Sequence, residues 1–348
     1  MKRSILAVAA LAAAAVTSHA AQAKDYGGVA CTSPPPDHCV LGQECTGAFL
    51  ANPGNATDPK TGRKFFLDYP CDLKPNEKVV FILNIHGAGS IGQWQRHYFP
   101  AMDSKEKYRV VVATPTAATS PTFGPGGPAT RVWVADADDA HLQNIADFVF
   151  DSFGRDHIKA FWLAGHSQGG ATSARIVCSP YFKDKVDGFL SLSGGRIGGS
   201  NMNPRFGPPK ADGSPPDARP PRAVPPLPAC EFSHIYETGE HEITSLQETS
   251  PWAEKYGCGP RVTRKDIVDK EPGYVYDNAR QGYPVWGMKA RPGVTKEYVY
   301  EKCKGGRVVA DFVRLDKGHT EGLEPKVTAE IVRLMVSAPG GKLNAVAN

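Results

Sequence analysis

A serine flanked by glycines stands where a predicted strand meets a predicted helix. The segment GHSQG (165–169) closes the strand-like run AFWLAGHS (160–167) and opens a helical pattern at 169–182. A G-x-S-x-G segment in this context is typical of a tight turn that lifts a nucleophilic serine out of a sheet, because small residues let strand and helix approach closely. The alternative is that Ser167 is only a turn residue. The strand before it and the helix after it favour a nucleophile, and they leave the N–H of Gln168 at a helix start, free to bind an oxyanion.

A serine nucleophile needs a base, and a histidine late in the chain is suited to that role. The stretch RLDKGHTEGL places His319 in a loop just before the helical pattern at 325–338. Where a G-x-S-x-G turn carries the nucleophile, the serine, the acid and the histidine follow one another along the chain in that order, which predicts the base at this position. The alternative is an ordinary surface histidine, since the chain contains ten. Its position in the order of elements favours catalysis.

The acid that orients the histidine is expected after the preceding strand. The stretch YETGEHEIT (236–244) contains Glu237, Glu240 and Glu242 but no aspartate. A glutamate can fix the tautomer of the histidine and stabilise its charged form as well as an aspartate can. We prefer Glu242, because it follows Gly239 in a G-x-x-E turn, and Glu240 is the close alternative. A zinc site at HEITS is disfavoured because the second histidine of that motif is missing, so we expect no metal.

The second oxyanion donor is expected in an early loop between a strand and a helix. The stretch NIHGAGSIG (84–92) nominates the backbone N–H of Ala88. The same stretch matches G-x-G-x-x-G through Gly87, Gly89 and Gly92, a pattern typical of dinucleotide binding. The acidic residue expected about 20 residues later is absent, since the next strand-like run, VVVATPT, ends without one. We therefore expect no cofactor.

These residues need a scaffold that brings them together. Strand-like runs alternate with helical patterns, and several runs are apolar almost throughout, as in strands covered on both faces. Such alternation predicts an α/β fold with a mostly parallel sheet. The predicted strands are 64–70, 79–87, 109–115, 160–167, 188–195, 233–240 and 308–319, and the predicted helices are 138–153, 169–182 and 325–338.

Two segments interrupt the alternation. Residues 196–229 hold ten of the thirty prolines and cannot form a helix or a central strand, so we expect either a surface loop or a flap over a site. Residues 244–305 form a longer insertion with Trp252, Trp286, Cys258 and Cys303. Tryptophans are candidates for an aromatic cleft wall, although core packing is the commoner role. We nominate Trp133, in RVWVAD before the 138–153 helix, as the substrate-binding residue.

The N-terminus reads as a secretory signal peptide over residues 1–23. Lys2 and Arg3 precede an apolar run at 5–16, and the small-residue site AQA occupies 21–23. The alternative is a buried N-terminal helix. The run is too short to span a membrane, which needs about 20 residues. We therefore expect a secreted or periplasmic protein without a membrane anchor.

The cysteines agree with export. An even number in an exported chain favours disulfides, and no C-x-x-C pair suggests a metal site. We expect a cysteine-containing N-terminal cap at 24–63 and a catalytic domain at 64–348. We also expect four cysteines to pair within the cap and Cys258 to pair with Cys303. The eight cysteines are Cys31, Cys39, Cys45, Cys71, Cys178, Cys230, Cys258 and Cys303.

Taken together, these segments resemble the α/β-hydrolase superfamily and, within it, the secreted esterases grouped with polyhydroxybutyrate depolymerases, feruloyl esterases and related carbohydrate esterases. The matching pieces are IHGAGS, DADDAHLQNIADFV, GHSQGG, SPWAEKYGC with the later Cys303, and DKGHTEGL. The resemblance implies a mostly parallel sheet of about eight strands with helices on both faces, and no cofactor. It places the nucleophile on Ser167, the base on His319 and the acid on Glu242. This chain has glutamate where the family usually has aspartate, KGH in place of GGGH, and an unusual cap and Pro-rich segment, so the substrate is not carried over.

The sequence therefore predicts a secreted serine esterase that acts on a polyester, a cell-wall ester or a small acyl ester. The formal net charge of +4 is mild, and the absence of a dense Lys/Arg cluster disfavours nucleic acid as a partner. The alternatives are a serine peptidase on the same fold and a non-catalytic binding protein of that fold.

Overall fold

The computed structural model describes residues 25–31, 51–121, 129–199, 201–221, 223–224, 226–275 and 283–345. The predicted signal peptide at 1–23 lies outside these ranges, as do Cys39 and Cys45. Among the described helices, none has both the length and the apolar character that crossing a membrane requires.

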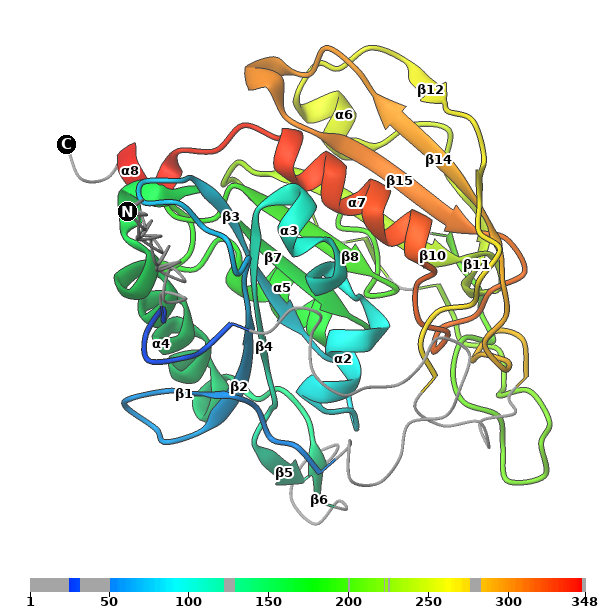
Figure 1. The fold of residues 1–348 in the computed structure, drawn as a ribbon. Coiled ribbons are helices and arrows are strands. Elements are labelled where there is room, and N and C mark those ends of the chain that lie inside the picture. The colour runs from blue at the N-terminus through cyan, green and yellow to red at the C-terminus, as the bar shows by residue number, and fades with distance from the viewer. Residues whose placement is uncertain are drawn as a thin grey trace, which may run out of the picture.

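One large sheet organises the described chain (Figure 1). Six neighbouring strands run parallel, namely β4, β3, β7, β8, β10 and β15. Antiparallel strands flank them on both sides, with β2 beside β4 and β14 beside β15. The predicted α/β class with a mostly parallel sheet is confirmed. The strands in spatial order are β1 (Ala56–Thr57), β2 (Lys64–Asp68), β4 (Val110–Pro115), β3 (Val79–Ile85), β7 (Ile158–His166), β8 (Gly188–Leu192), β10 (Ser233–Gly239), β15 (Val309–Arg314), β14 (Val294–Tyr300) and β12 (Arg261–Thr263), with β13 (Ile267–Val268) also paired to β14.

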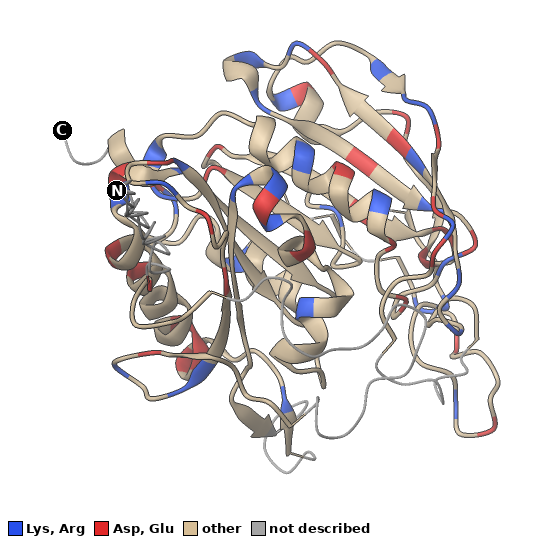
Figure 2. Cartoon of the chain, viewed as in Figure 1, with Lys and Arg blue, Asp and Glu red and all other residues tan. Residues whose placement is uncertain are grey.

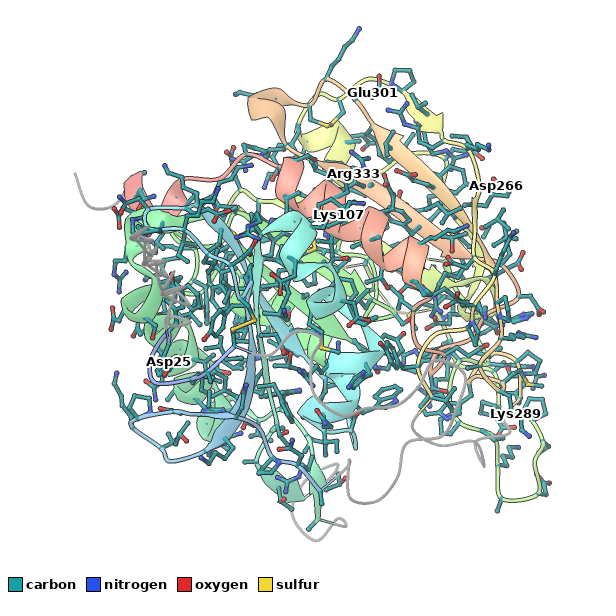
Figure 3. All side chains as sticks on the ribbon, in the orientation of Figure 1. Asp25, Lys107, Asp266, Lys289, Glu301 and Arg333 are labelled. Atoms are coloured by element: carbon teal, nitrogen blue, oxygen red, sulfur yellow. A yellow bond between two sulfur atoms is a disulfide. The ribbon has the colours of Figure 1, made fainter. Side chains whose placement is uncertain are left out.

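Helices cover both faces because successive strand side chains point to opposite sides. Phe81 and Leu83 of β3 pack into one core with α4 (Ala135–Phe153) and α5 (Gln168–Ile176). Val80 and Ile82 pack into the other core with α2 (Gly92–Tyr98) and α7 (Pro325–Ser337). In Figure 3 the labelled Lys107 and Arg333 mark α3 (Lys105–Tyr108) and α7, which pack together on this second face. Figure 2 shows acidic and basic residues interspersed along α7 and β14.

Several boundaries differ from the sequence prediction. The predicted helix at 169–182 stops at Ile176, because Pro180 disfavours helical geometry in the residue before it and removes a donor N–H. The predicted strand at 308–319 ends at Arg314, and the rest is the loop that carries His319. The helix predicted from residue 138 begins at Ala135.

The two interrupting segments flank the carboxyl ends of the strands. The described part of 196–229 is a loop whose only strand is β9 (Asn201–Met202), which pairs with β11 (Ile243–Ser245). The 244–305 insertion contributes α6 (Pro251–Lys255) and the edge strands β12, β13 and β14. Figure 3 shows the labelled Asp266 and Lys289 on the side formed by this insertion, far from the labelled Asp25. The remaining named elements are β5 (Thr119–Pro121), β6 (Ala129–Arg131) and α8 (Lys342–Ala345).

Three disulfides join described cysteines. Cys258 pairs with Cys303, as the sequence predicted, and this bond ties α6 to the end of β14. Cys31 pairs with Cys71, which lies beyond residue 63, so this bond joins the expected cap to the catalytic domain and does not close within the cap. Cys178–Cys230 links the chain after α5 to the end of the Pro-rich segment.

Candidate active site

Ser167 occupies a strained turn between β7 and α5. Its φ of 53° and ψ of −117° lie in a region that residues with a side chain rarely adopt. A Cβ at Gly165 would lie 2.3 Å from the backbone carbon of Gly169, and one at Gly169 would lie 2.1 Å from the carbonyl oxygen of Ile85. Both positions therefore require glycine, and the close packing that they allow holds the serine at the carboxyl end of the strand.

His319 joins Ser167 to a carboxylate. Its Nε2 lies 2.8 Å from Ser167 Oγ, and its Nδ1 lies 2.7 Å from Glu242 Oε2. An ionised carboxylate only accepts hydrogen bonds, so Nδ1 carries the proton and Nε2 is left to accept the serine hydroxyl proton. His319 is 2% exposed and Glu242 is 3% exposed, which shields this chain of hydrogen bonds from water.

Glu242 is held as a carboxylate. Its Oε1 accepts hydrogen bonds from Ser193 Oγ at 2.6 Å and from the Gly239 N–H at 2.8 Å. Burial raises the pKa of Glu242, but the charge of His319 and these hydrogen bonds outweigh burial, so the net pKa is lowered. The carboxyl group therefore stays ionised beside the histidine.

The two other glutamates of the YETGEHEIT stretch face elsewhere. Glu240 is exposed, and its Oε2 accepts a hydrogen bond from the N–H of Asp316 at 2.8 Å. Glu237 forms a buried ion pair with Arg314 at 2.6 Å. Of the three candidates, the structure brings only Glu242 to His319.

The backbone of His319 is fixed by residues that the sequence analysis missed. Its carbonyl oxygen accepts hydrogen bonds from His166 Nε2 at 2.8 Å and from the Tyr98 hydroxyl at 3.2 Å. The rings of Tyr98 and His166 lie 3.9 Å apart. His166 occupies one of the two variable positions of the GHSQG segment, so the sequence could have drawn attention to it. Tyr98 lies 221 positions from His319 in the chain, and nothing in the sequence linked these two residues.

A buried group of charges holds the loop after β15. Arg314 pairs with Glu237 and lies 3.5 Å from Glu324, and Lys317 Nζ lies 2.7 Å from Glu324. The guanidinium of Arg314 also donates to the carbonyl oxygen of Glu321 at 2.7 Å. These contacts fix both ends of the loop on either side of His319.

The Gly87–Ala88 peptide is oriented by His86. His86 Nε2 accepts the N–H of Ala117 at 2.9 Å, so its proton is on Nδ1, which donates to the carbonyl oxygen of Gly87 at 2.6 Å. Burial lowers the pKa of His86 to about 4, so the ring stays neutral. In a trans peptide the N–H points opposite to the C=O, so the N–H of Ala88 faces away from His86. It has no hydrogen-bond partner among the described residues.

Gln168 and Trp133 connect the two loops that would supply oxyanion donors. The backbone N–H of Gln168 is at the first position of α5, where helical N–H groups lack an intrahelical partner. Its side-chain Oε1 accepts the N–H of Trp133 at 3.0 Å, and Trp133 Nε1 donates to the carbonyl oxygen of His86 at 2.7 Å. The Trp133 residue is only 5% exposed, so its ring packs beneath the loops. Its role in binding substrate stays a prediction.

Two aromatic side chains from the interrupting segments contact His319. The Phe206 ring meets the imidazole edge-on with centroids 4.7 Å apart, and the Trp286 ring lies 5.1 Å away at 30°. Phe206 belongs to the Pro-rich segment and Trp286 to the 244–305 insertion. The Pro-rich segment therefore lies against the site, as one of the two sequence interpretations expected.

All five predicted positions other than Trp133 lie at one edge of the sheet. Ala88 follows β3, Ser167 and Gln168 follow β7, Glu242 follows β10 and His319 follows β15. These strands are parallel, so their carboxyl ends meet at the same edge, where ligands of open α/β sheets bind. The arrangement combines a serine activated by a base, an ionised acid and two outward N–H groups, which suits attack on a carbonyl carbon.

The comparison with protein-family models agrees with this architecture. The model of the alpha/beta hydrolase family matches residues 79–330. Similar solved structures include the acetyl xylan esterase from Aspergillus awamori, with 12% identity over 79% of this chain and 94% of that chain and a TM-score of 0.42. They also include SOBER1 from Arabidopsis thaliana, with 12% identity over 74% of this chain and 97% of that chain and a TM-score of 0.38. A search of curated protein sequences gave no match.

Proposed function

The chain belongs to the alpha/beta hydrolase family, and on this premise we propose that it is a serine esterase that hydrolyses carboxylic esters. The observation that carries the proposal is the hydrogen-bonded chain from Ser167 through His319 to Glu242, with the serine held on a strained turn. Such a chain turns a weakly nucleophilic hydroxyl into an effective nucleophile.

In the first half of the reaction, Ser167 Oγ attacks the ester carbonyl carbon while His319 Nε2 takes the hydroxyl proton. The carbonyl oxygen becomes an oxyanion, held by the N–H groups of Ala88 and Gln168. Each such donor typically stabilises the transition state by about 3 kcal/mol. The imidazolium then gives its proton to the alcohol oxygen as the C–O bond breaks, which leaves an acyl-serine.

In the second half, water replaces the alcohol. His319 takes a proton from the water as its oxygen attacks the acyl carbon, and returns that proton to Ser167 when the acid leaves. Glu242 stabilises the imidazolium in both halves. Its lowered pKa supports this role, because a protonated acid would offer no charge to the histidine.

We also propose that the protein works outside the cytoplasm, secreted or in the periplasm. The three described disulfides support this placement, because such bonds persist in oxidising compartments. Substrates met there include polyesters, cell-wall esters and small acyl esters.

The test is covalent labelling combined with turnover. Purified protein is incubated with a fluorophosphonate and its intact mass is measured, and hydrolysis of 4-nitrophenyl acetate, butyrate and octanoate is followed in parallel. We expect one adduct on the wild type and none on Ser167→Ala, with turnover lost in the variant. An amide arm with acetyl 4-nitroanilide separates esterase from amidase chemistry.

The matched control is Ser152→Ala near the end of α4, which precedes the amino end of β7, whereas Ser167 follows the carboxyl end of that strand. It should label and turn over like the wild type. A folded wild type with its disulfides formed that takes no adduct and hydrolyses none of these esters would overturn the proposal.

A further inference from the structure

A groove lies between the Pro-rich segment and the strand that pairs with it. It has a volume of 540 Å³. Its walls include Met202, Pro204, Phe206, Arg219, Val224 and Thr244. Phe206 is also the residue whose ring meets the His319 imidazole at 4.7 Å, so the inner end of the groove is the edge of the site.

The walls of the groove expose apolar side chains. Met202 is 41% exposed and Val224 is 57% exposed, which places both among the few large apolar side chains that are exposed in the described chain. Prolines add further apolar surface. Clustered apolar exposure of this kind marks a surface that binds a partner molecule of apolar character.

Arg219 is the charged residue of this lining, which contains no aspartate or glutamate. No carboxylate among the described residues pairs with its guanidinium, whereas Lys210 of the same loop pairs with Asp217 at 2.8 Å. Arg205 of this loop donates to the carbonyl oxygen of Pro216. The groove therefore presents one uncompensated positive charge within an apolar surround, which is complementary to an anion carried on an apolar frame.

The loop that carries Arg219 is closed at its base. The N–H of Arg219 donates to the carbonyl oxygen of Pro204 at 2.8 Å, which brings the two ends of the 204–219 loop together. Within the loop, Nη2 of Arg219 lies 3.6 Å from where a Cβ of Gly207 would be, beside Phe206. The guanidinium therefore lies near the residue that follows Phe206, at the aromatic end of the groove.

The side of the substrate that enters the groove follows from the chemistry of His319. The imidazolium protonates the leaving oxygen through Nε2, which lies in the plane of the ring, so the alcohol part of the ester lies on the His319 side of Ser167. Phe206 contacts this ring and also lines the groove. The groove therefore adjoins the alcohol side of the site.

We propose that the groove binds the alcohol part of the ester and selects alcohols that carry a carboxylate on an aromatic or other apolar frame, with Arg219 as the specificity-determining residue. The inference rests on the proposed esterase function and names the substrate class of that same site. The apolar walls take the frame, and Arg219 pairs with the carboxylate.

Two pairs of probe esters test the side and the charge separately. The alcohol pair is 4-acetoxybenzoate and methyl 4-acetoxybenzoate, which share the acetyl group and differ in the charge of the leaving phenol. The acyl pair is 4-nitrophenyl hydrogen adipate and 4-nitrophenyl methyl adipate. For each pair the ratio of kcat/KM for the charged to the neutral ester is measured on wild type, Arg219→Gln and Arg205→Gln. Comparing variants cancels the intrinsic reactivity of each ester.

We expect Arg219→Gln to lower the ratio of the alcohol pair about tenfold, the size of one charge-assisted hydrogen bond at a partly exposed site. Arg205→Gln removes an equal charge from the same loop but not from the groove, and should leave the ratio within about twofold. In the wild type, raising NaCl from about 20 to about 500 mM should lower the ratio, because salt screens an exposed charge.

Three results would overturn the inference while leaving the esterase proposal intact: an unchanged ratio in Arg219→Gln, an equal drop in Arg205→Gln, or a drop confined to the acyl pair. In each, the neutral esters still turn over through Ser167. Failure of the wild type to hydrolyse even the neutral esters, together with no fluorophosphonate adduct, would instead overturn the proposed function and this inference with it.

Discussion

Two regions meet at His319, and they are built in opposite ways. On the sheet side, the histidine is buried and both its ring nitrogens and its carbonyl oxygen have partners. On the groove side, the Pro-rich loop is exposed, and Arg219 has no ionic partner among the described residues. One region is fixed by interactions within the protein, and the other leaves apolar surface and charge for a ligand.

This difference separates chemistry from selectivity. Residues at the ends of parallel strands are positioned by the sheet, so a change there alters the reaction of every substrate. The 204–219 part of the loop is mostly exposed, so a change there alters which substrate is preferred. The predictions below test that separation, first where it should be strongest.

The largest effect is expected for Glu242→Gln. The amide keeps the shape of the carboxylate but removes its charge and offers the histidine the wrong hydrogen-bonding partner, so kcat should fall about 10⁴-fold. KM should change little, because the Glu242 side chain is buried, is bonded to His319 and does not line the groove. The measurement is steady-state kinetics on 4-nitrophenyl acetate.

Glu240→Gln is the matched control, two residues away on the same turn. Its carboxylate is exposed and bonds to the backbone of Asp316, so activity should stay close to wild type. Equal losses in the two variants would contradict the assignment of Glu242 and would point to the turn as a whole.

An intermediate effect is expected for His86→Ala. The substitution removes the donor that fixes the carbonyl of Gly87 and strands the buried N–H of Ala117, so the peptide before Ala88 gains freedom to turn. We expect kcat to fall about 30-fold, less than the 10²–10³-fold that follows outright loss of an oxyanion donor. KM for a neutral ester should stay nearly constant.

His86→Asn tests whether the loss of activity comes from the missing hydrogen-bond donor or from lost packing. Its Nδ2 can occupy the place of the histidine Nδ1 and donate to Gly87, so it should recover part of kcat while still leaving Ala117 unpaired. If Asn and Ala lose activity equally while both remain folded by circular dichroism, then His86 supports the loop only by packing.

The same division explains how much could be predicted from the sequence. The GHSQG turn and the apolar strands are local patterns, and the parallel sheet follows from their alternation. The G-x-x-E pattern favoured Glu242 but left Glu240 as a close alternative, because the choice depends on a close approach between distant segments. A Cβ at Gly239 would lie 2.4 Å from the carbonyl oxygen of Lys317. That contact turns Glu242 inward.

Contacts made by the interrupting segments were beyond prediction for the same reason. Phe206 reaches His319 from a Pro-rich stretch without periodicity, and nothing in the stretch indicates which of its residues faces inward. Trp133 was nominated from its position before the 138–153 helix, and its role in binding substrate stays a prediction. Its indole N–H donates to the carbonyl oxygen of His86, a partner that the sequence did not indicate. An aromatic residue's place depends on such partners, which lie elsewhere in the chain.

The smallest effect is expected at the contact between the Pro-rich segment and the turn that carries Glu242. Asn203 of the Pro-rich segment donates through Nδ2 to the carbonyl oxygen of His241 at 3.1 Å, and its backbone N–H donates to the carbonyl oxygen of Glu242 at 2.8 Å. Asn203→Ala removes the bond to His241 and also the exposed bond that Asn203 Oδ1 accepts from the N–H of Arg205 at 2.9 Å, whereas the backbone bond and the pairing of β9 with β11 remain. The half-buried bond to His241 contributes about 1 kcal/mol and the exposed bond to Arg205 less, so the charged-to-neutral ratio of the alcohol pair should fall about fivefold at most as the groove loosens. The kcat for 4-nitrophenyl acetate should hold, because that small ester does not fill the groove. If kcat falls together with the ratio, then the loop also positions Glu242. In that case the loop contributes to the chemistry as well as to the selectivity.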